Sequence, residues 1–183
     1  MIAIIDTSSL LAFVRYYLPF DRNGNFKALM HSKIVSGEIL ILDKIVDESK
    51  YQSQGIILKE LEFLTEKKNH VTTSEFLPSK TFFNLVEHQF CNKDIKKLKN
   101  ITDSEFELEK NRFLNGADAN LLLCAISLKS KNPVIVTEET VNANDGKLFK
   151  KIPDNCKSVD ITCCTLPVYF KNHLQIDLGS ILM

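Results

Sequence analysis

The stretch Ile2-Ala3-Ile4-Ile5-Asp6-Thr7-Ser8-Ser9 decides the fold predicted for this chain. Its apolar run is rich in β-branched residues, which favours a short buried strand. The run ends at Asp6, and three hydroxyl residues follow before a helical pattern begins. In open α/β sheets ligands gather at the carboxyl ends of the strands, so Asp6 is a candidate metal-binding or catalytic residue.

The composition is typical of one compact domain with a hydrophobic core. The chain has 183 residues, of which 44% are hydrophobic. Lys plus Arg and Asp plus Glu both number 23, so any recognition of phosphate must be local. The five cysteines are odd in number and are expected to be reduced. Because the sequence has no signal peptide and no apolar run of about 18 residues, we expect a soluble, cytoplasmic protein without a membrane span.

Short apolar runs alternate with helical patterns along the chain. Strands are predicted at residues 2–5, 39–42, 134–137 and 159–162. Helices are predicted at residues 9–18, 26–35, 44–53, 56–67, 79–90, 104–113, 117–130 and 167–173. This order predicts an α/β fold, a three-layer α/β/α sandwich with a central, mainly parallel sheet, in a single domain over residues 1–183. The almost wholly helical pattern of residues 54–115 indicates a helical elaboration in the middle of the chain.

A second candidate acid, Asp118, lies in the first turn of the helix with the most apolar pattern. Leu121, Leu122 and Ala125 share its side of that helix, so we expect Asp118 to face the core side. The alternative is that Asp118 only complements the helix dipole, a contribution of ~0.3–1 kcal/mol. Asp6 has a similar alternative as a helix N-cap, although the hydroxyl residues that follow it make a carboxylate cap unnecessary.

Two pairs of adjacent acids also follow predicted strands. Glu138 and Glu139 come after strand 134–137, and at most one of them is expected to enter a shared site because consecutive residues face opposite ways. Asp47 and Glu48 lie where strand 39–42 gives way to a helix, and the pattern leaves open which of them faces the site. For each of these acids taken singly, solvent exposure is the plainer interpretation.

Gathering several carboxylates at one edge has a large electrostatic cost. Mutual repulsion and loss of hydration amount to several kcal/mol unless positive charge compensates. A hard divalent cation is the natural compensation, because Mg²⁺ and Mn²⁺ prefer oxygen ligands and often bind substrate phosphates as well. Such a site suits the hydrolysis of phosphodiester bonds.

Three motifs together resemble the PIN domain, a family of metal-dependent nucleases. They are Ile4-Ile5-Asp6-Thr7-Ser8, Ala117-Asp118-Ala119 and Val136-Thr137-Glu138-Glu139. The last motif, with Lys151-Ile152-Pro153-Asp154-Asn155-Cys156 after it, is similar to a PIN-like subgroup related to toxins of bacterial toxin–antitoxin pairs. The resemblance spans both ends of the chain. It is weakest over residues 65–110, where no motif matches and an insertion is expected.

The resemblance implies a catalytic site of four acids, which are Asp6, Glu48, Asp118 and Glu139. Of these, Asp6, Asp118 and Glu139 would bind Mg²⁺ or Mn²⁺, and Thr7 or Ser8 would orient a carboxylate. The implied reaction is cleavage of RNA that leaves a 5′-phosphate. The implied partners are an antitoxin protein and a second copy of the chain. Many PIN domains have aspartate in place of Glu139, and the longer side chain would change the affinity for metal.

Two lysine-rich stretches are candidates for contact with RNA phosphates. Lys147, Lys150 and Lys151 follow Glu139 near the predicted active edge, and we expect them to bind substrate. The four lysines of residues 93–99 are followed at once by acids, which is typical of a solvated surface. The histidines and cysteines lack the paired spacing of a zinc site.

Two other classes of protein share part of this pattern. A PIN-like module that has lost catalysis would serve in RNA or protein binding. A phosphatase of the haloacid-dehalogenase type also has an aspartate after its first strand, but it needs a second aspartate two residues on, where this chain has Ser8. The sequence therefore predicts a metal-dependent ribonuclease, and the resemblance implies a member of the toxin class. The inactive binding module is the alternative.

Overall fold

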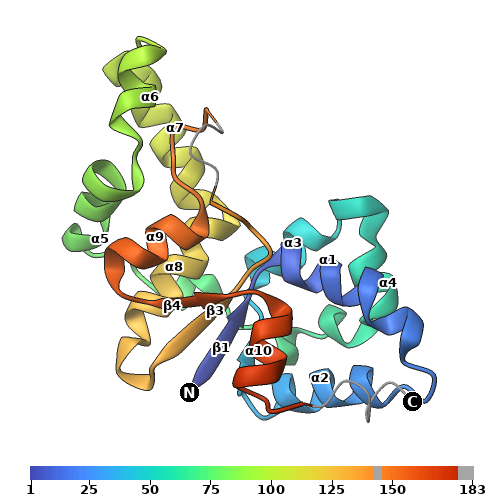
Figure 1. Cartoon of the computed structure of the whole chain (residues 1–183). Helices are drawn as coiled ribbons and strands as arrows, with labels where there is room; N and C mark the ends of the chain where they lie inside the picture. The colour runs from blue at the N-terminus through green and yellow to red at the C-terminus, as the bar shows by residue number, and fades with distance from the viewer. Residues whose placement is uncertain (142–145, 177–183) are drawn as a thin grey trace.

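A four-stranded parallel sheet forms the centre of the protein (Figure 1). The computed structural model describes residues 1–141 and 146–176. The strands are β1 (Ile2–Ile5), β2 (Ile39–Leu40), β3 (Pro133–Val136) and β4 (Thr162–Cys164). Their order is β2-β1-β3-β4, and every neighbouring pair is parallel. All four residues of β3 are buried, as expected for a central strand that is covered on both faces.

Helices cover both faces of this sheet. The α-helices are α1 (Thr7–Tyr16), α2 (Asn25–Val35), α3 (Asp43–Ser49), α4 (Ile56–Glu60), α5 (Lys80–Leu85), α6 (Lys93–Leu98), α7 (Asp103–Asn115), α8 (Ala117–Ser127), α9 (Ile152–Val159) and α10 (Leu166–Asn172). Short 3₁₀ turns lie at Leu18–Phe20, Gln52–Gly55, Glu62–Thr65, Lys67–Asn69, Thr73–Glu75 and Lys129–Lys131, and Val86–Phe90 forms a π-helix. Figure 1 shows α1 and α10 on one side of the strands and α8 and α9 on the other. The predicted α/β fold with helices on both sides of a parallel sheet is confirmed.

An aromatic cluster joins the helices on one side of the sheet. Phe13 of α1 and Phe26 of α2 have ring centroids 5.0 Å apart, and Phe26 lies 4.8 Å from Phe170 of α10. Tyr17 packs edge-on against Phe170 at 5.4 Å. All three phenylalanines are fully buried, so this cluster fixes α2 and α10 relative to α1 and to the strand that precedes it.

Most predicted elements are present, and the largest error lies before β4. The predicted strand 159–162 was wrong by about three residues, since Val159 ends α9 and Asp160 adopts a left-handed conformation with φ of 55°. The sequence analysis also missed α9, in which Pro153 lies within the first turn. Proline is tolerated there because the first backbone N–H groups of a helix have no partner inside it.

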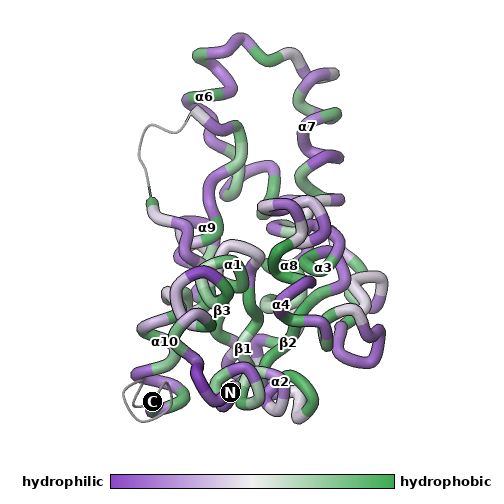
Figure 2. The backbone as a smooth tube through the Cα atoms, turned by 90° about the vertical axis from the view of Figure 1, so that its right-hand side faces the viewer, coloured by the Kyte–Doolittle hydropathy of each residue, from purple (hydrophilic) through white to green (hydrophobic). Residues whose placement is uncertain are grey.

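The middle of the chain is helical but more broken than its pattern indicates. The predicted helix 56–67 is a single short helix, α4, followed by 3₁₀ turns, and α6 was not predicted. Helices α6 and α7 form an arm that extends away from the sheet (Figure 2). We call residues 86–115 the arm.

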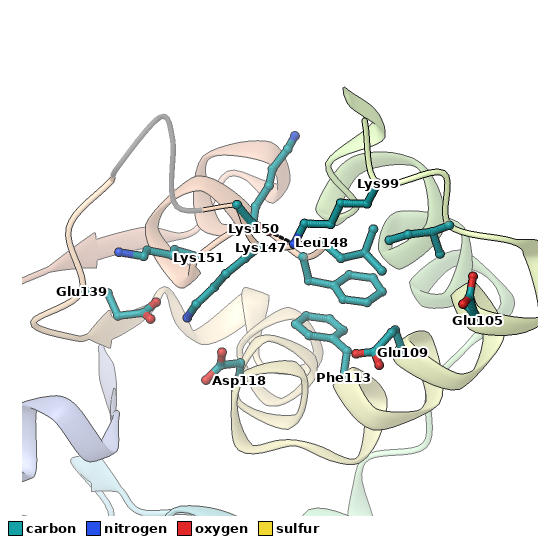
Figure 3. Close-up of a pocket in the computed structure, with 13 residues that line it drawn as sticks. Lys99, Glu105, Glu109, Phe113, Asp118, Glu139, Lys147, Leu148, Lys150 and Lys151 are labelled. Atoms are coloured by element: carbon teal, nitrogen blue, oxygen red, sulfur yellow. Dashed lines mark hydrogen bonds between the residues drawn. The ribbon is translucent and has the colours of Figure 1, made fainter. Parts of the chain in front are cut away.

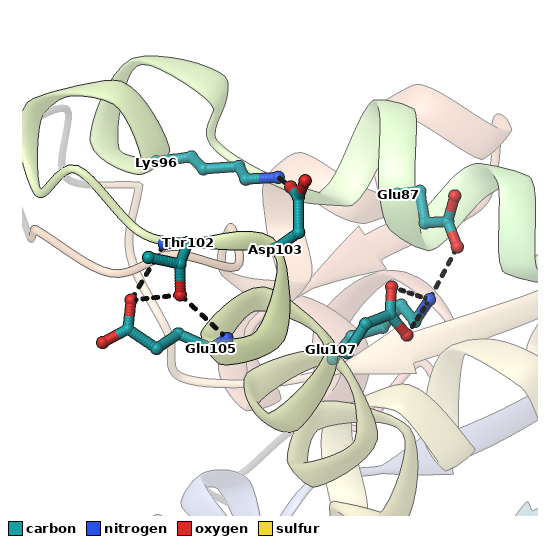
Figure 4. A network of polar contacts seen from close by, with 7 residues as sticks. Glu87, Lys96, Thr102, Asp103, Glu105 and Glu107 are labelled. Atoms are coloured by element: carbon teal, nitrogen blue, oxygen red, sulfur yellow. Dashed lines mark hydrogen bonds and ion pairs between the residues drawn. The ribbon is translucent and has the colours of Figure 1, made fainter.

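A polar network holds the arm together (Figure 4). The Thr102 side chain and Glu105 form a reciprocal capping box at the start of α7. Lys96 of α6 pairs with Asp103 at 3.2 Å. Farther along α7, Lys110 bridges Glu87 at 2.8 Å and Glu107 at 2.7 Å. These contacts hold α7 against α6 and against the π-helix Val86–Phe90.

Two further findings concern the chain as a whole. No helix within residues 1–141 and 146–176 is long and apolar enough to cross a membrane. The five cysteines have free thiols, and Cys91, Cys124 and Cys156 are buried. Burial raises the pKa of Cys124 to about 12, so this thiol packs as a small apolar side chain.

Replacing Phe26 tests the importance of the aromatic cluster. Phe26→Ala removes a fully buried ring and is expected to lower the free energy of unfolding by about 3–5 kcal/mol, as urea denaturation would measure. The matched control is Phe20→Ala, because Phe20 is 63% exposed and its loss should cost less than about 1 kcal/mol. Equal costs for the two variants would contradict this account of the core.

Candidate functional site

Asp6 lies at the carboxyl end of β1, where the strand meets α1. Its carboxylate accepts hydrogen bonds from Ser8 Oγ at 2.6 Å and from Thr137 Oγ1 at 2.8 Å. It also accepts a longer bond of 3.4 Å from the backbone N–H of Ser8, so Asp6 is the N-cap of α1 as well as an acid of the sheet edge. The residue is only 5% exposed. These bonds fix the carboxylate, as the ligand of a preorganised site requires.

Thr137 is a member of this site that the sequence analysis did not assign. The register pairs Ile5 of β1 with Val136 of β3, so the next residues, Asp6 and Thr137, are neighbours at the edge. The available signal was a hydroxyl residue directly after the apolar run of β3. To use it one must know that β1 and β3 are adjacent, and 131 residues separate the two hydrogen-bonded side chains.

The structure distinguishes between Asp47 and Glu48. The Glu48 carboxylate accepts a hydrogen bond from Thr7 Oγ1, directly after the strand that ends at Asp6. Asp47 instead pairs with Lys50 at 2.5 Å on the outer surface of α3. Glu48 is therefore the acid of α3 that faces the sheet edge. The two hydroxyls after Asp6 have separate partners, since Thr7 contacts Glu48 and Ser8 contacts Asp6.

Glu138 and Glu139 point in different directions, and each holds the start of a helix. Glu139 accepts a hydrogen bond of 3.0 Å from the backbone N–H of Ile152 at the start of α9. Glu138 accepts one of 2.7 Å from the backbone N–H of Leu166 at the start of α10. Both residues are half-buried. Only Glu139 lines the cavity that Asp118 also lines, so it is the member of this pair that lies next to the other acids.

Asp118 shows that the four acids are within electrostatic reach of one another. The pKa of Asp118 is raised from its ordinary 3.8 to about 7. Desolvation at the start of α8 is the largest cause, followed by the negative charges of Asp6, Glu139 and Glu48 in that order, whereas the charge of Lys147 lowers the pKa. Asp118 is half-buried at the edge of the cavity. Asp6, Glu48, Asp118 and Glu139 therefore form one cluster, which we call the acid cluster.

A cavity of about 580 Å³ lies beside the acid cluster (Figure 3). Asp118 and Glu139 lie on one side of it, and the arm contributes Glu109 and Phe113 to the other. Four lysines also line the cavity, which are Lys99, Lys147, Lys150 and Lys151. Lys99 is exposed, as predicted for the lysine-rich stretch 93–99, and its ammonium group donates a hydrogen bond of 2.6 Å to the carbonyl of Gly146 in the cavity wall.

The chemistry of the acid cluster fits a hard divalent cation. Its donors are all carboxylate oxygens, which Mg²⁺ and Mn²⁺ prefer, and the raised pKa of Asp118 indicates repulsion that a cation would relieve. His31 stacks on Phe63 and His70 contacts the carbonyl of Leu64. Within the described part of the chain, no three His, Cys, Asp or Glu side chains are already close enough together to hold a metal ion. The carboxylates would have to move closer to one another to bind one.

Comparison with known proteins links the chain to one family. A family model with the description "Domain of unknown function (DUF4411)" matches residues 4–176, which is nearly the whole chain. The match includes the last two residues of β1, the acid cluster and the arm. The searches of curated proteins and of solved structures gave no significant match.

The raised pKa of Asp118 predicts how stability depends on pH. The folded chain holds a proton on Asp118 that the unfolded chain releases between about pH 4 and pH 7, so this residue makes folding less favourable as the pH rises through that range. Asp118→Asn stays neutral. In metal-free buffer at about pH 8 it should raise the free energy of unfolding by a few kcal/mol, and at about pH 4 the gain should vanish.

Urea denaturation at both pH values measures this difference. The control is Asp160→Asn, because the Asp160 side chain is 99% exposed and Asn tolerates its left-handed backbone. A gain for Asp118→Asn that is the same at both pH values would show that charge on Asp118 is not its cause.

Proposed function

We propose that this chain, which belongs to the family described as "Domain of unknown function (DUF4411)", is a ribonuclease that depends on a divalent metal ion. The observation that supports the proposal is the acid cluster, in which four carboxylates from distant parts of the chain lie within electrostatic reach of one another. Two of them, Asp118 and Glu139, line a cavity that lysines also line. Residues with this arrangement attract a cation and phosphate together. The resemblance of the surrounding motifs to PIN domains supplies the type of reaction.

In this proposal Asp6, Asp118 and Glu139 hold Mg²⁺ or Mn²⁺. When bound, the cation supplies positive charge that stabilises the negative charge on the phosphate as the bond breaks. The role of the protein is to fix the carboxylates in place. Ser8 and Thr137 hold Asp6 by hydrogen bonds of 2.6 and 2.8 Å, so this ligand is oriented before the cation arrives.

Glu48 is the acid left for proton transfer. Its carboxylate, oriented by Thr7, accepts the proton of the water that attacks phosphorus. The new bond joins the water oxygen to phosphorus, and the bond that breaks joins phosphorus to the 3′-oxygen, which takes a proton from solvent water as it leaves. The products are a 5′-phosphate and a 3′-hydroxyl, which agrees with the reaction implied by the resemblance.

The lysines of the cavity are proposed to bind the RNA backbone. Lys147, Lys150 and Lys151 lie in one short segment that follows Glu139, and Lys99 adds a fourth cation from the arm. Equal numbers of acidic and basic residues in the whole chain leave RNA attraction to this local concentration of charge.

The resemblance to PIN-like toxins extends the proposal to partners. A toxin of this kind acts on RNA in the cytoplasm, is held inactive by an antitoxin protein and often dimerises. We propose the same arrangement for this chain. The proposal has no membrane component.

The alternative is a PIN-like module that binds RNA or protein without cleaving it. The observation in its favour is the spacing of the carboxylates, none of which forms a group of three at ligand distance within residues 1–141 and 146–176. Calorimetry distinguishes the two functions. Absence of Mg²⁺ and Mn²⁺ binding at millimolar concentrations would favour the module.

The nuclease proposal predicts cleavage of RNA by the purified chain with Mn²⁺ or Mg²⁺. Asp6→Asn and Asp118→Asn should each reduce cleavage to background while circular dichroism shows a folded protein, because each removes a charged oxygen ligand. Cleavage of a labelled RNA on a denaturing gel is the measurement. Wild-type rates in both variants would exclude this site as the catalytic centre.

Glu48 and Asp47 offer a matched pair on one helix turn. Glu48→Gln should lower the cleavage rate by about 100-fold or more, as expected for loss of a general base. Asp47→Asn should leave the rate within about twofold, since Asp47 pairs with Lys50 on the outer surface. Reversal of these two effects would assign the catalytic role to Asp47.

The toxin assignment is tested in cells. Induced expression of the wild-type chain in bacteria is expected to stop growth, because RNA is degraded, whereas Asp118→Asn expressed to the same level should not. Growth curves and total RNA on a gel are the measurements. Equal growth of both cultures, with cleavage still present in vitro, would support the nuclease activity but contradict the toxin assignment.

A further inference from the structure

Lys147 points from the wall of the cavity toward the acid cluster. Figure 3 shows its ammonium group directed between Asp118 and Glu139, whereas the side chain of Lys150 extends the opposite way. Lys147, Asp118 and Glu139 all line the same cavity. The charge of Lys147 lowers the pKa of Asp118, against the effect of the neighbouring acids. Lys147 is thus placed to compensate the acids.

The backbone that carries Lys147 is fixed to the arm. Phe149 forms an antiparallel bridge with Cys91. The backbone N–H of Asn92 donates to the carbonyl of Leu148 at 2.7 Å, and that of Lys150 donates to the carbonyl of Phe90 at 2.8 Å. Residues 148–150 are therefore paired like a short strand with the base of the arm.

Side chains of the arm fix the same segment at two more points. Phe149 stacks on Phe113 of α7 with centroids 4.4 Å apart and planes 12° apart. Lys99 donates a hydrogen bond of 2.6 Å to the carbonyl of Gly146, which adopts φ of +66°, a conformation that favours glycine. Lys147 lies between these two anchors, so its backbone position is set on both sides.

This fixation has an electrostatic consequence. A lysine on a free loop spends its time in solvent, since its long side chain loses entropy when held. The Lys147 side chain is exposed, but the arm fixes the backbone on both sides of it beside the acid cluster. The cluster carries carboxylates from four elements and needs positive charge to remain together.

We propose that Lys147 is a built-in counter-ion of the acid cluster, which competes with the divalent cation for Asp118 and Glu139 and is displaced into the cavity when the cation binds. The inference rests on the proposed function in taking this cluster as the cation site. It assigns Lys147 a positioning role toward the acid cluster, in addition to the contact with RNA phosphates proposed above. It also gives the arm a purpose, because the arm holds this lysine in place.

Calorimetric titration of the full chain with Mn²⁺, after removal of bound metal with EDTA, tests the proposal. Lys147→Gln removes the competing charge and is expected to lower the dissociation constant for Mn²⁺ by about tenfold. Lys147→Arg keeps the charge and should remain within about threefold of the wild type. Lys150→Gln is the matched control for a change in net charge, and its affinity for Mn²⁺ should also stay within about threefold.

Thermal unfolding of the metal-free variants is the second measurement. Without its counter-ion the cluster repels itself more strongly, so Lys147→Gln should unfold about 2–4 °C below Lys150→Gln at low salt. Saturating Mn²⁺ should reverse that order. Affinity for Mn²⁺ that is unchanged or weaker in Lys147→Gln would overturn the proposal, as would equal tightening in Lys150→Gln.

The outcome for the nuclease is separable from this one. If Lys147→Gln binds Mn²⁺ more tightly and the wild-type chain cleaves no RNA, the counter-ion role of Lys147 is supported and the ribonuclease function is contradicted. If RNA is cleaved and Lys147→Gln binds Mn²⁺ no more tightly than the wild type does, the ribonuclease function is supported and the counter-ion role of Lys147 is contradicted. Absence of Mn²⁺ binding in every variant would overturn the counter-ion as well.

Discussion

The register between β1 and β3 is the constraint on which the acid cluster depends. Ile5 pairs with Val136, and the backbone N–H of Asp6 donates to the carbonyl of Val136 at 2.9 Å. Asp6 and Thr137 then leave the sheet side by side. A slip of one residue would turn every side chain of a strand to the opposite face, and both strands are packed into the core. Core packing therefore fixes the geometry of the site.

The register gathers charges that repel each other, and several local interactions oppose that repulsion. Ser8 and Thr137 donate hydrogen bonds to Asp6, Thr7 donates to Glu48, and the start of α9 donates to Glu139. Asp118 instead takes up a proton more readily, with its pKa raised to about 7. The carboxylates of the cluster therefore repel one another, and positive charge would reduce that repulsion.

The sequence predicted the features that depend on local pattern. β1 was predicted with its observed bounds, and the apolar periodicity of α8 placed Asp118 in its first turn. Features that depend on which segments are neighbours were not predictable from a single sequence. Thr137 was missed because its partner is 131 residues away. Lys99 is exposed as predicted, but its contact with the carbonyl of Gly146 was not predictable because the two residues are 47 positions apart. The choices of Glu48 over Asp47 and of Glu139 over Glu138 likewise required tertiary contacts.

The long separation between the members of the acid cluster has a consequence for synthesis of the protein. Asp6 and Glu48 are made early, but Asp118 and Glu139 come from the last part of the chain, and β3 must pair before Asp6 meets Thr137. Contacts between such distant residues form late in folding. The acid cluster therefore cannot be assembled until β3 and Glu139 have left the ribosome. In the proposed ribonuclease, this topology would delay the cleavage of RNA until the chain has been made beyond residue 139.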